Sequence, residues 1–246
     1  NWTGRMPIRG RPLATLALLW LAGRLAMGGL FGLNMVLAMM VDVAFMLAIA
    51  GVIAVEIIAG RNWKNLIVLA PVALFSIANI LFHLEVMTSG TSDFSRRMGF
   101  GVVIFLITLI GGRIIPSFTR NWLAKNGPAD LPIPFNRFDA FCLAGGAVAL
   151  GLWVGFPDAT FTQVALFFAA ALHFARLPRW KGWLARRSFL LVMLHVAYLF
   201  IPVGFLALAL EAPSTGFHLL GIGAIGGMTS AVMMRATLGH SGRALE

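Results

Sequence analysis

The stretch SFLLVMLHVAYLFIPVGFLALAL, Ser188–Leu210, decides the fold class of this chain. It contains no acidic side chain and no Lys or Arg. A helix rises about 1.5 Å per residue and the hydrocarbon core of a bilayer is roughly 30 Å thick, so ~20 apolar residues cross it. A continuous apolar run without alternation indicates a helix, because a helix satisfies its own backbone groups in lipid. The stretch therefore predicts a transmembrane helix.

Seven further runs are also long and largely apolar. Hydrophobic residues make up 59% of the 246 residues and charged residues only 11%, which excludes a water-soluble globule. We therefore predict an all-α fold: a polytopic integral membrane helix bundle of about eight transmembrane helices, forming one domain over residues 1–246. The other runs are Pro12–Phe31, Asn34–Ala59, Leu66–Leu84, Met98–Ile115, Phe138–Phe156, Phe161–Ala175 and Gly216–Leu238.

The basic residues predict the orientation of these helices. Lys and Arg accumulate in cytoplasmic loops, and sixteen of the 19 lie in the two tails and in every second loop, from Arg5 and Lys64 to Arg243. Arg96 and Arg97 lie in the other loops and Arg24 lies within the first run. Both ends of the chain are therefore predicted to face the cytoplasm. The net charge of +10 follows this topology and does not indicate a nucleic-acid partner.

Two charges inside the first two runs predict an ion pair. Arg24 and Asp42 lie at equal distances from the turn around Leu33, so an antiparallel hairpin places them at the same depth. Pairing makes two buried charges tolerable in a membrane. A structural ion pair is one interpretation, and a proton or ion relay is the other.

The histidines are candidate metal ligands, because imidazole is costly in hydrocarbon unless it is used. His83 and His218 are expected near the periplasmic side, with Asp42 and Glu85 at similar depth. His195 lies inside the seventh run and shares a helix face with Tyr198. His173 and His240 are expected at the cytoplasmic interface. The single cysteine, Cys142, excludes a disulfide within the chain and a site with several thiolates.

Two arginines and several glycines remain. Arg113 and Arg235 close the fourth and eighth runs, where each either reaches the interface or holds an anionic group such as a haem propionate. The stretch GIGAIG, Gly221–Gly226, has no preceding strand and is not a dinucleotide site. Close helix contacts are predicted instead at three pairs of small residues: Gly28 with Gly32, Gly151 with Gly155, and Gly223 with Gly227.

Several of these stretches together resemble the NnrS family. They are NWTGR (1–5), GGRIIPSFTRNWL (111–123), LHVAY (194–198) and FHLLGIGAIGGMTSAVMMRATLGHSGR (217–243). The resemblance implies a bacterial inner-membrane protein that contains haem and copper and takes part in the nitric oxide response and in denitrification. It favours Arg113, His195, Tyr198, His218, Arg235 and His240 as site residues. Family members are read as about twelve helices, so we expect about four to precede Asn1.

Three functions remain open at this stage. The first is a protein that binds haem b, and more weakly copper, and handles nitric oxide, with His195, His218, Arg113, Arg235 and Tyr198 around the haem and His83, His195, His218 and His240 as metal ligands. The second is a secondary transporter or proton-coupled permease that uses Arg24 and Asp42. The third is an assembly factor that packs against an oxidoreductase. No sequence motif identifies an enzymatic reaction.

Overall fold

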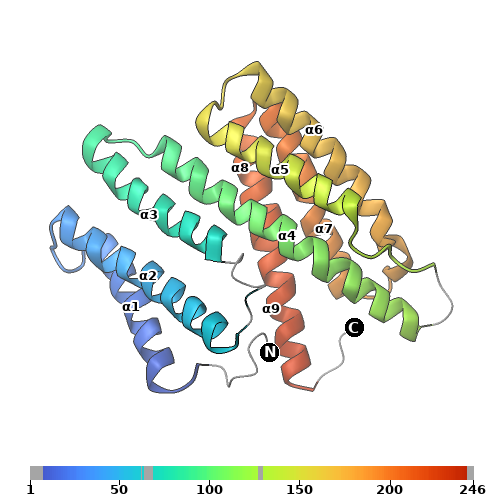
Figure 1. The fold of residues 1–246 in the computed structure, drawn as a ribbon, viewed down its shortest axis with the longest axis horizontal. Coiled ribbons are helices and arrows are strands. Elements are labelled where there is room, and N and C mark those ends of the chain that lie inside the picture. The colour runs from blue at the N-terminus through green and yellow to red at the C-terminus, as the bar shows by residue number, and fades with distance from the viewer. Residues whose placement is uncertain (1–7, 62, 64–68, 127–129, 243–246) are drawn as a thin grey trace. The chain divides into compact units, whose positions relative to one another are not determined.

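The computed structural model describes residues 8–61, 63, 69–126 and 130–242, and these residues form helices joined by short turns (Figure 1). Seven helices in the described part are long and apolar enough to cross a membrane. The predicted all-α membrane fold is therefore confirmed. The first predicted run is also helical, but α1 (Arg11–Met27) has only 17 residues, fewer than the ~20 that span the hydrocarbon core. Arg5, Lys64 and Arg243 lie outside the described residues.

The chain packs as two compact units, Asn1–Val102 and Val103–Glu246, which divide within α4. The prediction of a single membrane domain stays a prediction. In the first unit α1 packs against α2 (Met35–Ala59), and α2 packs against α3 (Leu69–Ser89). The side chain of Asn34 accepts a hydrogen bond from the Leu37 amide and caps α2, which fixes the start of the second helix of this hairpin.

Helix α4 (Asp93–Lys125) has 33 residues and is much longer than predicted. Its early start follows from Glu85 on α3. The two Glu85 carboxylate oxygens accept hydrogen bonds from the amides of Phe94 at 3.0 Å and Ser95 at 2.9 Å. These amides belong to the first turn of α4, where backbone donors have no partner within the helix. Glu85 is therefore a cap rather than a metal ligand.

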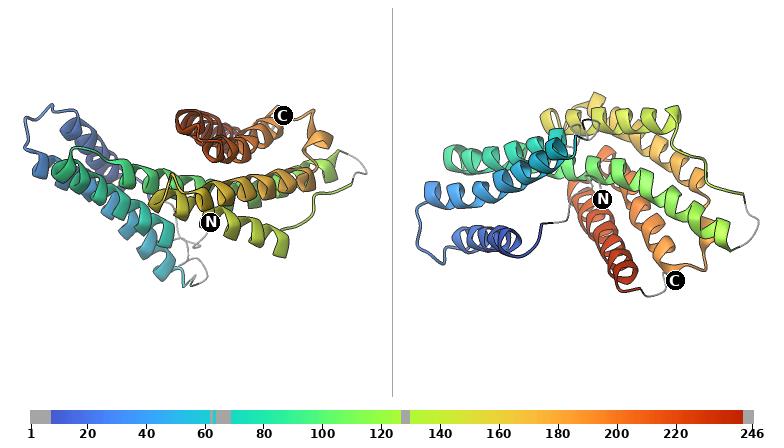
Figure 2. Two further views of the ribbon diagram at one scale, coloured as in Figure 1. Left: turned by 90° about the horizontal axis from the view of Figure 1, so that it is seen from above. Right: turned by 60° about the horizontal axis from the view of Figure 1, so that its bottom comes forward.

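The second unit is organised around α7 (Phe189–Ala209), which packs against α6 (Thr160–Arg176) and against the helices that follow it. Helix α5 (Arg137–Gly155) runs beside α6 (Figure 2). Two short 3-10 turns, η2 (Leu177–Trp180) and η3 (Gly182–Ala185), join α6 to α7. Lys181 between them has a positive φ of 53°, so the chain reverses sharply there.

After α7 the chain continues as α8 (Pro213–His218), a π-helical segment η4 (Leu219–Gly226) and α9 (Gly227–His240). A Cβ on Gly223 would lie 2.2 Å from the Phe200 ring, and one on Gly227 would lie 3.1 Å from the Ala197 Cβ. The predicted close contact is therefore confirmed for this glycine pair. It is wrong for Gly151 and Gly155, because a Cβ at either position meets no described atom within 4 Å.

Candidate functional site

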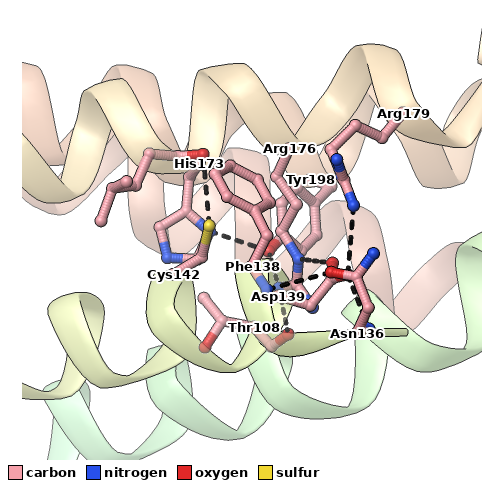
Figure 3. Close-up of polar contacts among 10 residues, drawn as sticks. Thr108, Asn136, Phe138, Asp139, Cys142, His173, Arg176, Arg179 and Tyr198 are labelled. Carbon is pink, nitrogen blue, oxygen red and sulfur yellow. Dashed lines mark hydrogen bonds and ion pairs between the residues drawn. The ribbon is translucent and has the colours of Figure 1, made fainter. Parts of the chain in front are cut away.

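A buried ion pair joins α5 and α6 in the second unit. Arg176, the last residue of α6, donates from Nε to Asp139 Oδ1 at 2.8 Å, and the two side chains are 0% and 2% exposed. Asp139 lies in the first turn of α5, where Oδ2 also accepts a hydrogen bond from the Asn136 amide at 3.1 Å. Figure 3 shows the cluster around this pair. The carboxylate is thus both a helix cap and the counterion of a buried guanidinium.

Only one of the two terminal nitrogens of the Arg176 guanidinium forms hydrogen bonds with the described residues. Nη1 donates to Tyr198 Oη at 2.8 Å and to the Thr108 carbonyl at 3.3 Å. The Trp180 ring lies 5.2 Å from the guanidinium carbon and the Phe135 ring lies 6.0 Å from it, a cation–π arrangement. Nη2 has no hydrogen-bond partner among the described residues. Two of the five N–H groups of this side chain are therefore unpaired.

Two adjacent glycines on α4 make room for this cluster. A Cβ on Gly112 would lie 2.3 to 2.5 Å from the guanidinium atoms of Arg176, and a Cβ on Gly111 would lie 3.4 Å from Cδ2 of Tyr198. A methyl group at the first position would overlap the cation. Gly112 is therefore needed for the close approach of α4 to Arg176, whereas a Cβ on Gly111 would make only an ordinary contact with Tyr198.

His173 completes the cluster through Tyr198. His173 Nδ1 and Tyr198 Oη are 2.9 Å apart, and both side chains are fully buried. Since Tyr198 Oη accepts a hydrogen bond from Arg176, its own O–H is available to donate to Nδ1, and the single N–H proton of the neutral imidazole then lies on Nε2. His173 Nε2 has no partner in the described structure, and it faces Gly146, where a Cβ would lie 3.0 Å from it.

His195 has the opposite tautomer. Its Nδ1 lies 2.8 Å from the Leu191 carbonyl, one turn earlier on α7. A carbonyl can only accept, so Nδ1 carries the proton and Nε2 carries a free lone pair. Nε2 is buried and has no partner among the described side chains and backbone groups. The ring packs against Gly182, where a Cβ would lie 2.8 Å from Nε2, and against Trp180, whose ring centroid is 6.4 Å away.

The first unit contains a separate polar cluster around Asp42. Arg24 on α1 pairs with Asp42 Oδ1, as the symmetry about the turn predicts. Oδ2 accepts a hydrogen bond from Asn79 Nδ2 at 3.0 Å and lies 3.1 Å from His83 Nε2. Asp42 and His83 are 4% and 2% exposed. This carboxylate therefore joins α1, α2 and α3.

The remaining predicted site residues lie outside these clusters. His218 is exposed on α8, with Nδ1 2.7 Å from the Ser214 carbonyl, and His240 is exposed at the end of α9. The guanidinium of Arg235 lies 3.9 Å from the Phe118 ring, and that of Arg113 lies 5.5 Å from the Phe135 ring. The structure thus places each arginine on an aromatic face of the second unit.

The sequence therefore predicts part of the site and misses part of it. His195 and Tyr198 both contact Trp180, but the Tyr198 hydroxyl binds Arg176 and His173 rather than sharing a space with His195. His173 lies three residues before the end of α6, but its side chain is 0% exposed, so it is packed inside the protein and does not meet water or headgroups as an interfacial residue would.

The pair of Arg176 and Asp139 was missed altogether, because both residues lie at helix ends that resemble ordinary loop positions. The signals that point to it are the N-x-x-D capping box at Asn136 and the Gly-Gly pair on α4.

These side chains fit a haem ligand better than a copper site. An imidazole whose Nδ1–H is anchored on a carbonyl and whose Nε2 lone pair is free is the state in which histidine binds iron, and partly buried His195 has it. Within the described residues there is no group of three or more His, Cys, Asp or Glu side chains that could hold a metal ion, so His195, His218 and His240 of the second unit do not form a shared site. No copper ligands are therefore identified among the described residues, and copper binding stays a prediction.

Comparison with known proteins gives one result. The family model described as "NnrS protein" matches residues 1–246. No curated protein and no solved structure matches the chain.

Proposed function

Because the chain belongs to the NnrS family along its whole length, we propose that it is a haem-binding membrane protein of the nitric oxide response, in which His195 would hold the haem iron. Family membership supports a role related to nitric oxide. The observation that supports His195 as the iron ligand is its Nε2 atom, which is buried and has no hydrogen-bond partner among the described residues.

The surroundings of His195 are suited to holding an iron atom. The Leu191 carbonyl fixes the ring orientation and the tautomer, which raises the basicity of Nε2 toward a metal. Trp180 covers the ring from η2. A b-type haem, when bound, supplies iron that binds small neutral gases such as nitric oxide. The protein would contribute an anchored ligand and the Trp180 ring beside it.

Arg113 and Arg235 are the candidate partners of the haem propionates. Each guanidinium stacks on a phenylalanine ring in the second unit, which orients it while leaving its N–H groups able to bind a carboxylate. His218 is the second candidate for the residue that would hold the haem iron, since its Nδ1 has the same kind of carbonyl anchor. We assign no copper ligands.

The location that we propose is the bacterial inner membrane, with both ends of the chain in the cytoplasm.

An absorbance spectrum of the full chain, purified in detergent after expression with ample haem, tests this proposal. We expect a Soret band in the wild type and its loss in His195→Gly, with recovery when imidazole is added to the variant. Val196→Ala, at the exposed next residue, should retain the band. A wild-type protein without a Soret band ends the proposal. If the His195→Gly variant keeps its full haem content, another residue binds the iron. His218→Gly is then the next variant to test.

A proton-coupled transport function is a second candidate, favoured by the position of Asp42. This buried carboxylate accepts hydrogen bonds from two other helices and pairs with an arginine whose side chain is half exposed. Intramembrane carboxylates of this kind occur in proton relays. The candidate predicts proton-dependent flux of a substrate in proteoliposomes without haem, and loss of that flux in Asp42→Asn.

A further inference from the structure

Unpaired buried polar atoms are concentrated at the junction of α6 and α7. Among the described residues six buried side-chain N or O atoms lack a hydrogen-bond partner, and five of them belong to residues between positions 173 and 195. Buried polar atoms in proteins are normally hydrogen-bonded. His195 Nε2 is the atom proposed above to bind iron, and the other four indicate that this junction binds a further group that the chain itself does not supply. The five are His173 Nε2, Arg176 Nη2, Arg179 Nε, Ser188 Oγ and His195 Nε2.

Two of these atoms are obligatory cationic donors. Arg176 Nη2 belongs to a side chain with 0% exposure. Arg179 Nε lies three residues later in η2, on a side chain that is 24% exposed and stacks on the Phe138 ring at 4.6 Å. Guanidinium groups cannot accept hydrogen bonds and do not lose their charge in proteins. The group that satisfies them must therefore be an acceptor.

The charges at the junction indicate that this acceptor is an anion. Asp139 binds Arg176 at 2.8 Å, whereas its other oxygen lies 3.9 Å from Arg179 Nη2, too far for a hydrogen bond. Lys181 pairs with Asp130 instead. A fully buried guanidinium and a partly exposed one thus share one carboxylate among the described residues, and an uncompensated charge in a membrane protein is costly.

We propose that Arg176 and Arg179 form a binding site for a singly charged oxyanionic group at this junction. Guanidinium N–H groups bind oxyanions with short, charge-assisted hydrogen bonds. The partial exposure of Arg179 gives access from the face at which α6 ends, and Arg176 forms the inner end of the site. A small inorganic oxyanion and the phosphate of a lipid headgroup have the same chemistry. The site does not depend on haem binding.

Two measurements on the purified full chain test the site. The first is calorimetric titration of detergent-solubilised protein with inorganic phosphate and with nitrite. The second is native mass spectrometry for retained phosphatidylglycerol. Arg179→Gln removes one cation while Arg176 keeps Asp139, so the fold should survive. We expect it to weaken binding about tenfold or more, because a hydrogen bond to a charged group contributes ~1.5 to 3 kcal/mol.

Arg187→Gln is the matched control, since Arg187 is exposed and lies near the same junction. Loss of phosphate or nitrite binding in Arg179→Gln, with Arg187→Gln unchanged, identifies a free oxyanion. Loss of retained lipid in the same comparison identifies a headgroup. Wild-type protein that binds neither, or equal binding by the wild type and Arg179→Gln, overturns the proposal. Arg176→Lys, which keeps the charge beside Asp139 but removes Nη2, must weaken binding as well.

Discussion

Arg176 and Asp139 are 37 residues apart in the sequence and form a hydrogen-bonded ion pair at 2.8 Å with almost no exposed surface. Removing one member leaves the other charge buried without a partner. We expect Asp139→Leu and Arg176→Met each to destabilise the protein by about 3 to 5 kcal/mol. The double variant should be much less destabilised than the sum, because two apolar side chains replace the pair. Thermal unfolding in detergent, followed by helical circular dichroism, measures the coupling.

Additive effects of the two substitutions would show that the pair is not coupled. Asp93→Asn and Arg96→Gln provide the surface comparison. Arg96 Nη2 lies 2.8 Å from Asp93 Oδ1, and both side chains are exposed. Exposed ion pairs contribute only about 0 to 1 kcal/mol to the free energy of unfolding.

Gly112→Ala should be destabilising although alanine favours helices. The new Cβ would lie 2.3 to 2.5 Å from the Arg176 guanidinium, and overpacking of this kind costs about 1 to 3 kcal/mol. Gly151→Ala is the control, because its Cβ would meet no described atom within 4 Å, and a helical Gly→Ala change stabilises by up to ~1 kcal/mol. Cys142 is fully buried and is the only cysteine, so a thiol-reactive fluorophore reports the unfolding temperature of both variants. Equal unfolding temperatures would contradict the close approach.

The helices could be predicted from the sequence because apolar length alone decides them in a bilayer. The pairing of Arg24 with Asp42 could also be predicted, because a tight hairpin places residues at equal distances from its turn side by side. Both predictions depend only on neighbours along the chain.

The cluster around Arg176 and Asp139 could not be predicted, because its members come from helices that meet only in the folded protein. Nothing local distinguishes Arg176 from the basic loop residues beside it, and its burial depends on Gly112 and Tyr198. The small-residue pairs show the same limit. Gly223 with Gly227 and Gly151 with Gly155 have identical spacing, but only the first pair faces another helix. Which face of a helix meets a neighbour is decided by tertiary packing.

Asp42→Asn should destabilise the first unit. The substitution keeps the shape of the side chain but removes the charge that pairs with Arg24 and holds His83 and Asn79. Because a hydrogen bond to a charged group contributes about 1.5 to 3 kcal/mol, we expect a loss of at least that size in the free energy of unfolding. Limited proteolysis of the detergent-solubilised protein, with cleavage sites mapped to the first unit, measures the effect. Unchanged cleavage in Asp42→Asn, compared with wild type and with Asp93→Asn, would exclude a stabilising role for this carboxylate.

The distribution of Lys and Arg predicts which face of the membrane each turn occupies. Thr91 lies in the exposed turn between α3 and α4, and Arg187 lies in the exposed turn before α7. The positive-inside rule places the first in the periplasm and the second in the cytoplasm. In a Cys142→Ala background each position is changed to cysteine, and intact cells are treated with a membrane-impermeant maleimide. We expect labelling of Thr91→Cys in intact cells and of Arg187→Cys only after the membrane is opened. Labelling in the reverse order would invert the orientation and place the Arg176 and Arg179 site on the periplasmic side, because both residues lie at the same end of α6 as Arg187.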